Sequence, residues 1–151
     1  MHIGAIVANK GSSVHTIEPH RTLTDVVDSM LALRVSSLLV MDDGGKTAGI
    51  ITEHDVIRTL KRLPDAWKTT RVDDVMTRNL FTASPDDELG EVIAAMTERH
   101  IRHLPVMDGE RIAGVLSIRD LIRAAMEELA RHNEMMKRYI REWPEGGESP
   151  G

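Results

Sequence analysis

The apolar positions between residues 14 and 58 follow two periodicities in turn, and each predicts a different element. An apolar stripe with spacings of three and four begins just after Thr22, which predicts an amphipathic helix with this threonine as its N-cap. The stripe consists of Leu23, Val26, Val27, Met30 and Leu31. Two short apolar runs, 38–41 and 48–51, flank a glycine-containing turn and predict a buried hairpin. A second helix is predicted from Thr52, so the expected order is strand, helix, strand, strand, helix.

This unit occurs twice along the chain. The stretch from Val14 to Arg58 recurs from Leu80 to Arg123, at an offset of 66 residues that becomes 65 after the shorter second turn. Residues that recur unchanged include Thr16, Pro19, Met30, Leu38, Gly49 and Asp55, which return as Thr82, Pro85, Met96, Leu104, Gly114 and Asp120. A lone unit of about 45 residues buries too little apolar surface to be stable, so the two units are expected to pack together.

The expected fold class is therefore α+β, with two β-α-β-β-α repeats related by pseudo-twofold symmetry and an extended C-terminal helix. Residues 1–66 are assigned to the first repeat with its N-terminal lead-in, and residues 67–126 to the second repeat. Residues 127–151 form the helical extension and tail.

The last helix is predicted to continue far beyond the second repeat, because no Gly or Pro interrupts the chain from Ser117 to Trp143. Apolar residues recur on it every seven positions, at Ile122, Leu129, Met136 and Trp143, with Met126 and Ile140 beside them. Such a seam packs on a partner helix or on the module itself. We expect a homodimer.

Composition narrows the possible functions. The 151-residue chain has no Cys, which removes disulfides and thiolate chemistry and fits a reducing compartment. Its formal net charge of −5 disfavours binding to the nucleic-acid backbone. It shows neither a secretory leader nor an apolar run of about 18 residues that could span a membrane. We expect a cytoplasmic protein that binds neither nucleic acid nor membranes.

Both repeats carry the same type of string where the hairpin ends and the second helix starts. The strings are Gly49-Ile50-Ile51-Thr52-Glu53-His54-Asp55 and Gly114-Val115-Leu116-Ser117-Ile118-Arg119-Asp120. Together with the repeat and the strand order, they resemble a CBS domain pair, also called a Bateman module, over about residues 3–125. The resemblance implies a stand-alone regulatory module that binds an adenine nucleotide and catalyses no reaction.

The residue types in the two strings suit a nucleotide. An ionised Asp can accept two hydrogen bonds at once, as the vicinal hydroxyls of a ribose require, while a hydroxyl at a helix start suits a phosphate. By resemblance, Asp55 and Asp120 hold ribose, and Thr52 and Ser117 face phosphate, in two pseudo-symmetric clefts. The same spacing also fits a capping box, in which each pair only stabilises a helix start, and both interpretations stay open.

The two repeats differ just before their central strands. The second has Arg102 and His103 where the first has Ser36 and Ser37. In CBS pairs these positions meet near the pseudo-twofold axis, which implies that Arg102 and His103 donate to phosphates whose charge the serines cannot balance. A solvated strand flank is the alternative for Arg102.

Four further candidates come from the resemblance. Lys10 and Gly11 resemble a segment that lines the adenosine cleft in related pairs, although Lys10 also fits an ordinary exposed charge. Met76 occupies the comparable place before the second repeat, where it either packs on adenine or belongs to the core. Arg119 is included because it lies within the second string.

The sequence offers little for catalysis or metal binding. Gly45-Lys46-Thr47 resembles the end of a P-loop, but Val40 stands where that motif requires Gly. No His pair has a metal-ligand spacing with a matching carboxylate, and no nucleophile and base pair emerges. We therefore expect no enzyme and no metal. The expected ligand is AMP, ADP or ATP, with NAD possible, sensed on behalf of an unknown effector protein. The alternative is a ligand-free dimerisation or interaction module.

Overall fold

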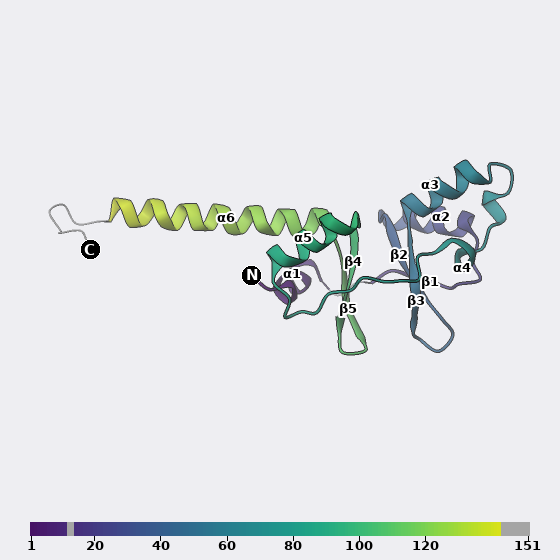
Figure 1. Ribbon diagram of the computed structural model, residues 1–151, viewed down its shortest axis with the longest axis horizontal. Coiled ribbons are helices and arrows are strands. Elements are labelled where there is room, and N and C mark those ends of the chain that lie inside the picture. Colours follow the sequence, from purple (N-terminus) through teal and green to yellow (C-terminus); the bar gives the residue numbers. More distant parts are fainter. Residues whose placement is uncertain (12–13, 143–151) are drawn as a thin grey trace.

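Two α+β repeats lie side by side in the computed structural model, which describes residues 1–11 and 14–142 (Figure 1). The first repeat comprises β1 (Thr16–Ile17), α2 (Leu23–Leu33), β2 (Ser37–Met41), β3 (Thr47–Thr52) and α3 (Glu53–Arg62). Its sheet has the order β1-β2-β3, with β1 parallel and β3 antiparallel to the central β2. The predicted helix, hairpin and second helix are all confirmed.

The second repeat has the same order of elements with a reduced opening strand. It comprises α5 (Leu89–Arg99), β4 (His103–Asp108), β5 (Arg111–Ser117) and α6 (Ile118–Arg141). In place of a first strand, Ala83 forms a single parallel bridge with Val106, which matches the pairing of Ile17 with Val40 in the first repeat. The expected α+β class, with two β-α-β-β-α repeats and an extended C-terminal helix, is therefore confirmed.

Capping boxes define where three helices begin. The hydroxyls of Thr22, Thr52 and Ser117 each accept a hydrogen bond from the backbone N–H three residues later, and the Asp there accepts one from the cap's own N–H. The predicted N-cap at Thr22 is confirmed. The capping interpretation of both strings is also realised, because these boxes satisfy N–H groups that would otherwise lack partners at the helix starts.

Each repeat is completed by the lead-in helix of the other. The lead-in α1 (Ile3–Lys10) precedes the first repeat, but its Ile3 N–H donates to Asp87 O of the second at 3.0 Å. After η1 (Trp67–Thr69), α4 (Val72–Val75) precedes the second repeat, but the Val72 N–H donates to Arg21 O of the first at 2.8 Å. The two lead-ins thus cross between the repeats in a pseudo-symmetric exchange.

The apolar core is divided into two clusters, and the exchanged lead-ins contribute to both. The cluster of the first repeat includes Leu23, Val26, Leu38, Val40 and Ile51, together with Val72 and Met76. The cluster of the second repeat includes Leu89, Val92, Met96, Leu104 and Leu116, together with Ile3 and Ile6. Burial of these lead-in side chains ties the two repeats into one module.

The glycine of each string makes room for the crossing lead-in. A Cβ on Gly49 would lie 2.6 Å from the carbonyl oxygen of Thr77, which is bridged to Ile50 by two backbone hydrogen bonds of 2.9 Å. A Cβ on Gly114 would meet the Val7 side chain at 3.1 Å. Glycine at this position is therefore explained by close approach of the backbone within the fold.

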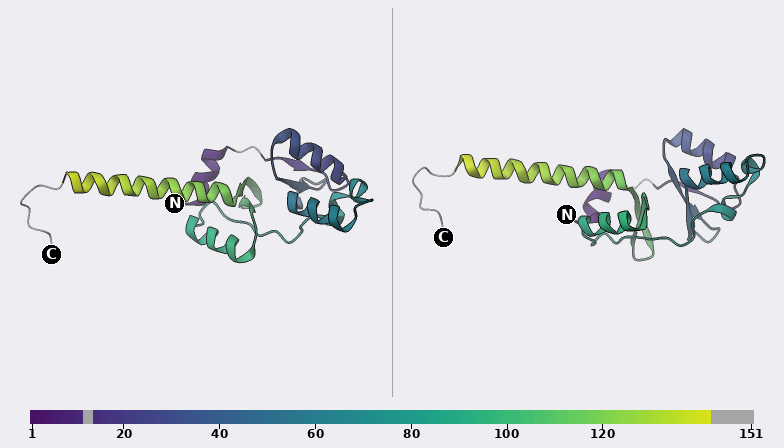
Figure 2. Two further views of the ribbon diagram at one scale, coloured as in Figure 1. Left: turned by 90° about the horizontal axis from the view of Figure 1, so that it is seen from above. Right: turned by 45° about the horizontal axis from the view of Figure 1, so that its top comes forward.

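The helix α6 extends well past the rest of the molecule, as the views in Figures 1 and 2 agree. Its last buried residue is Ala124. The predicted seam residues Ile122, Leu129 and Met136 are exposed, so the described part of the chain does not cover them. Trp143, the fourth member of the predicted seam, lies outside the described residues.

Candidate functional site

A pocket of about 320 Å³ opens between the two repeats beside the second string, a volume within the range of about 300–1,000 Å³ that small-ligand sites occupy. The first repeat contributes Val14, His15, Arg34, Val35, Ser36, Ser37 and Leu39, the second contributes His103, Val115 and Ser117, and α1 contributes Lys10. Four of the lining side chains are apolar, and the others carry hydroxyl, imidazole and cationic groups. The structure thus brings together five of the predicted site residues: Lys10, Ser36, Ser37, His103 and Ser117.

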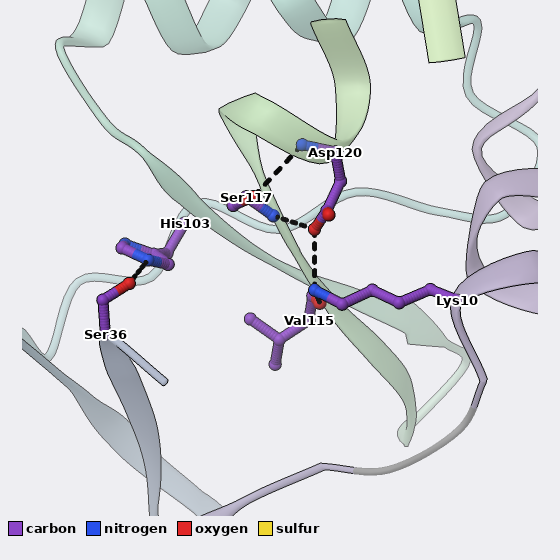
Figure 3. A network of polar contacts seen from close by, with 6 residues as sticks. All are labelled: Lys10, Ser36, His103, Val115, Ser117 and Asp120. Carbon is purple, nitrogen blue, oxygen red and sulfur yellow. Dashed lines mark hydrogen bonds and ion pairs between the residues drawn. The ribbon is translucent and has the colours of Figure 1, made fainter. Parts of the chain in front are cut away.

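Asp120 does not itself line the pocket, but one of its oxygens binds two residues that do, Lys10 and Ser117 (Figure 3). Its Oδ2 accepts a hydrogen bond of 2.8 Å from the Ser117 N–H and one of 2.6 Å from Lys10 Nζ. Lys10 Nζ also donates to the Val115 carbonyl oxygen at 3.0 Å. Neither bond to the carboxylate uses Oδ1, which leaves that oxygen for a further donor.

The surroundings of Asp120 keep it ionised. Burial by itself would raise the pKa of the carboxyl, but the hydrogen bonds from Lys10 and from the Ser117 backbone more than offset this effect. The net pKa is lowered, so the group is a carboxylate, an acceptor only, at neutral pH. A ligand group that binds it must therefore be a donor such as a hydroxyl.

His103 connects the two repeats across the pocket. Its Nε2 lies 2.8 Å from Ser36 Oγ (Figure 3). This hydrogen bond joins the start of β4 to the residue just before β2. Burial lowers the pKa of the imidazole, and Lys10 and Arg102 act in the same direction, while Glu53 and Asp120 oppose them. The ring is therefore neutral at pH 7, with one nitrogen donating and the other accepting.

The depressed pKa of His103 predicts a loss of stability on acidification. Above its ordinary value of 6.5 the ring is neutral both folded and unfolded. As the pH falls below that value, the unfolded chain takes up the proton first, so the free energy of unfolding decreases. We expect denaturant titrations at pH 7 and pH 5 to show a smaller decrease for His103→Gln than for the parent. The same decrease in both proteins would contradict this assignment.

The first string is in a different environment. The Asp55 side chain is only 5% exposed, compared with 21% for Asp120. Its Oδ2 accepts from the Thr52 N–H and hydroxyl, at 2.9 and 3.1 Å, and its Oδ1 lies 3.5 Å from Arg58 Nη1. Both carboxylate oxygens of Asp55 therefore have partners within α3 and its cap, whereas the bonds from Ser117 and Lys10 to Asp120 use Oδ2 alone.

Four other predicted residues lie outside the pocket lining. Met76 is buried in the first core cluster, beneath Gly49, which favours the core interpretation that was left open. Gly11 ends α1 with a φ of 93°. Arg102 and Arg119 have exposed side chains, and the Arg102 carbonyl accepts from the Ile118 N–H. None of these four residues is among those that line the pocket.

Sequence reasoning missed part of the pocket lining. Arg34 ends α2 with a left-handed φ of 56°, and this turn brings it, Val35 and the start of β2 to the pocket. Its counterpart His100 ends α5 with a φ of 55°. The sequence did offer one signal for this part of the lining, because Arg34 and His100 occupy equivalent positions in the repeat, just before the central strands. The conformation at such a helix end sets the direction of the residues that follow it. His15 and Val14 carried no such signal.

The described part of the chain shows neither a membrane-spanning helix nor a metal-binding cluster. No helix there combines the length and apolar composition that a membrane crossing requires. Within residues 1–11 and 14–142, no three His, Cys, Asp or Glu side chains form a cluster that could bind a metal ion.

Comparison with known families matches both repeats. A sequence model of the CBS domain fits residues 7–62 and again residues 72–127. The chain belongs to the CBS-domain family. Its two repeats are thus a CBS pair, which confirms the resemblance drawn from the two strings, and the pocket lies between the two CBS domains.

Individual relatives agree with this assignment. The mitochondrial CBS domain-containing protein CBSX3 of Arabidopsis thaliana is 34% identical over 123 residues, which are 79% of this chain and 60% of that protein. Inosine-5'-monophosphate dehydrogenase of Methanocaldococcus jannaschii is 34% identical over 111 residues, 73% of this chain and 21% of the enzyme. The chain therefore spans less than two thirds of either relative.

A solved structure shows the same fold. The CBS-domain containing protein ATU1752 of Agrobacterium tumefaciens superposes with a TM-score of 0.80 at 26% identity, covering 82% of this chain and 92% of that one.

Proposed function

We propose that this CBS pair is a regulatory module that binds an adenine nucleotide, AMP, ADP, ATP or NAD, in the pocket beside Ser117 and Asp120. The observation that carries the proposal is the ionised Asp120 in the first turn of α6, which is hydrogen-bonded through Oδ2 to Lys10 and Ser117, two residues that line the pocket. A ribose hydroxyl supplies the donor that this carboxylate accepts. The apolar lining residues Val14, Val35, Leu39 and Val115 suit a base, and Lys10, Arg34 and His103 suit phosphates.

The position of Lys10 suggests how binding is sensed. Lys10 is the last residue of α1 and Asp120 lies in the first turn of α6, so their ion pair joins the crossing lead-in to the long helix. A ribose diol that binds both carboxylate oxygens donates one hydroxyl to the unused Oδ1 and the other to Oδ2, where it competes with Lys10. Ligand binding then changes the junction of α1 and α6, and α6 presents that change to a partner.

We also propose that the module forms a homodimer through the exposed seam of α6. In this proposal it regulates an effector protein in the cytoplasm. We further propose that it catalyses no reaction, because its sequence offers no nucleophile and base pair. The competing function is a ligand-free interaction module, which the capping boxes at Thr52 and Ser117 favour.

A panel of thermal shifts tests the choice. With AMP, ADP, ATP or NAD at about 100 times its dissociation constant, we expect about 2.7 kcal/mol of stabilisation. At this chain length that corresponds to a Tm increase of roughly 5–11 °C. GTP and S-adenosylmethionine serve as controls. A GTP response equal to that of ATP would contradict adenine selectivity, and no response to any nucleotide would favour the ligand-free module.

A further inference from the structure

The outer part of α6 presents apolar side chains that the described chain leaves uncovered. Every residue from Met126 to Glu142 is exposed, while the last buried position is Ala124. The large apolar residues on it include Met126 at 67%, Leu129 at 61%, Met136 at 49% and Ile140 at 69% exposure. Helices in proteins are stabilised mainly by packing of an apolar face, so this segment calls for a partner.

The spacing on this face is that of a coiled coil. Counting from Ile122, the steps are four, three, four, three and four residues, and they end at Ile140. At about 3.6 residues per turn, all six positions fall within an arc of roughly 80° on the helix surface. The d positions are Ile122, Leu129 and Met136, and the a positions are Met126, Asn133 and Ile140.

Asn133, the polar residue in this seam, indicates the partner. A single Asn at an a position of a two-stranded parallel coiled coil meets the same residue of an identical helix, and the two amides hydrogen-bond to each other. In an antiparallel pair, a positions face d positions, so Asn133 would be buried against Leu129 or Met136 without a polar partner. An identical, parallel partner satisfies the amide.

Charges at the border of the seam favour the same arrangement. An antiparallel pair that keeps all six seam layers places Arg123 of one helix near Lys137 of the other, because both occupy e positions. These like charges repel. The parallel arrangement keeps the two copies of Arg123 at one end and the two copies of Lys137 at the other, separated by about four helical turns along each helix.

We propose that residues 122–141 of α6 form a parallel, two-stranded coiled coil with a second copy of this chain, registered by Asn133. The inference deepens the proposed homodimer and is independent of nucleotide binding. It places the two CBS pairs at the same end of the coil, with each Lys10–Asp120 junction at the start of the helix that leads into it.

Cysteine cross-linking of the full chain tests the orientation, because the parent sequence has no Cys. Met126→Cys and Ile140→Cys lie at a positions toward opposite ends of the seam, where a parallel dimer brings each to its own copy. Arg131→Cys, on the opposite face of the helix, is the matched control. We expect most of the protein to form a covalent dimer on oxidation in both seam variants and little or none in the control.

Sedimentation of the unmodified chain and of Asn133→Leu completes the test. We expect a dimer for the parent, and for Asn133→Leu a loss of the unique dimeric state in favour of larger species. A monomeric parent would overturn the homodimer together with the coiled coil. A dimeric parent without cross-links at either seam position, or with cross-links equal to those of Arg131→Cys, would overturn only the parallel coil. The thermal-shift panel of nucleotides is read separately and decides the nucleotide proposal.

Discussion

Replacing Asp120 with asparagine is expected to weaken adenine-nucleotide binding roughly 5- to 150-fold, which corresponds to about 1–3 kcal/mol. Asn keeps one oxygen for the Ser117 N–H but loses the charge and the second acceptor that a ribose diol requires. The folded state should change little, because the lost ion pair joins Asp120 to a Lys10 side chain that is 46% exposed. Isothermal titration with AMP, together with the Tm of the ligand-free protein, measures both quantities.

Asp55→Asn is the matched variant in the first repeat. Because Asp55 is buried and both of its oxygens already have partners, we expect its main effect to be a lower stability, by about 1–3 kcal/mol. The affinity for AMP should stay close to that of the parent. An equal loss of affinity in both variants would instead support two occupied clefts, and an unchanged affinity in Asp120→Asn would assign both carboxylates to capping alone.

Ile3→Ala is expected to destabilise the protein by about 2–5 kcal/mol, because it removes a large side chain from a closed core. Ile3 is fully buried in the cluster of the second repeat, although it precedes the first repeat in sequence. The corresponding decrease in Tm is roughly 4–20 °C for a chain of this length. Denaturant unfolding of the full chain measures the free energy directly.

Leu31→Ala provides the control for this variant. Leu31 belongs to the predicted apolar stripe of α2 but is 74% exposed, so its truncation should change the free energy of unfolding by less than about 0.5 kcal/mol. If Ile3→Ala were as mild as Leu31→Ala, α1 would contribute nothing to the second core, and the exchange of lead-ins would be wrong.

The fold and the location of the strings could be predicted from local signals. The stripe after Thr22, the hairpin around residues 42–46 and the helix starts at Thr52 and Ser117 depend on periodicity, turn residues and caps within a few positions of each other. Because the pattern occurs twice, the helix, the hairpin and the second helix were each predicted from two separate stretches of sequence. These features arise from interactions between near neighbours in the chain, which is why the sequence by itself determined them.

The site depended on contacts between distant residues. Lys10 meets Asp120 across 110 positions, and no periodic pattern links the two residues. The contact of Ser36 with His103 across 67 positions agrees with the resemblance, which brings the two strand starts together, but no local signal indicates it. The two strings look equivalent in sequence, yet the Asp55 side chain is 5% exposed inside its cap, while that of Asp120 is 21% exposed and bonded to two pocket-lining residues, Lys10 and Ser117. Burial and pocket lining follow from how the repeats and the crossing lead-ins pack, so only the tertiary structure decided which of the two carboxylates is available to a ligand.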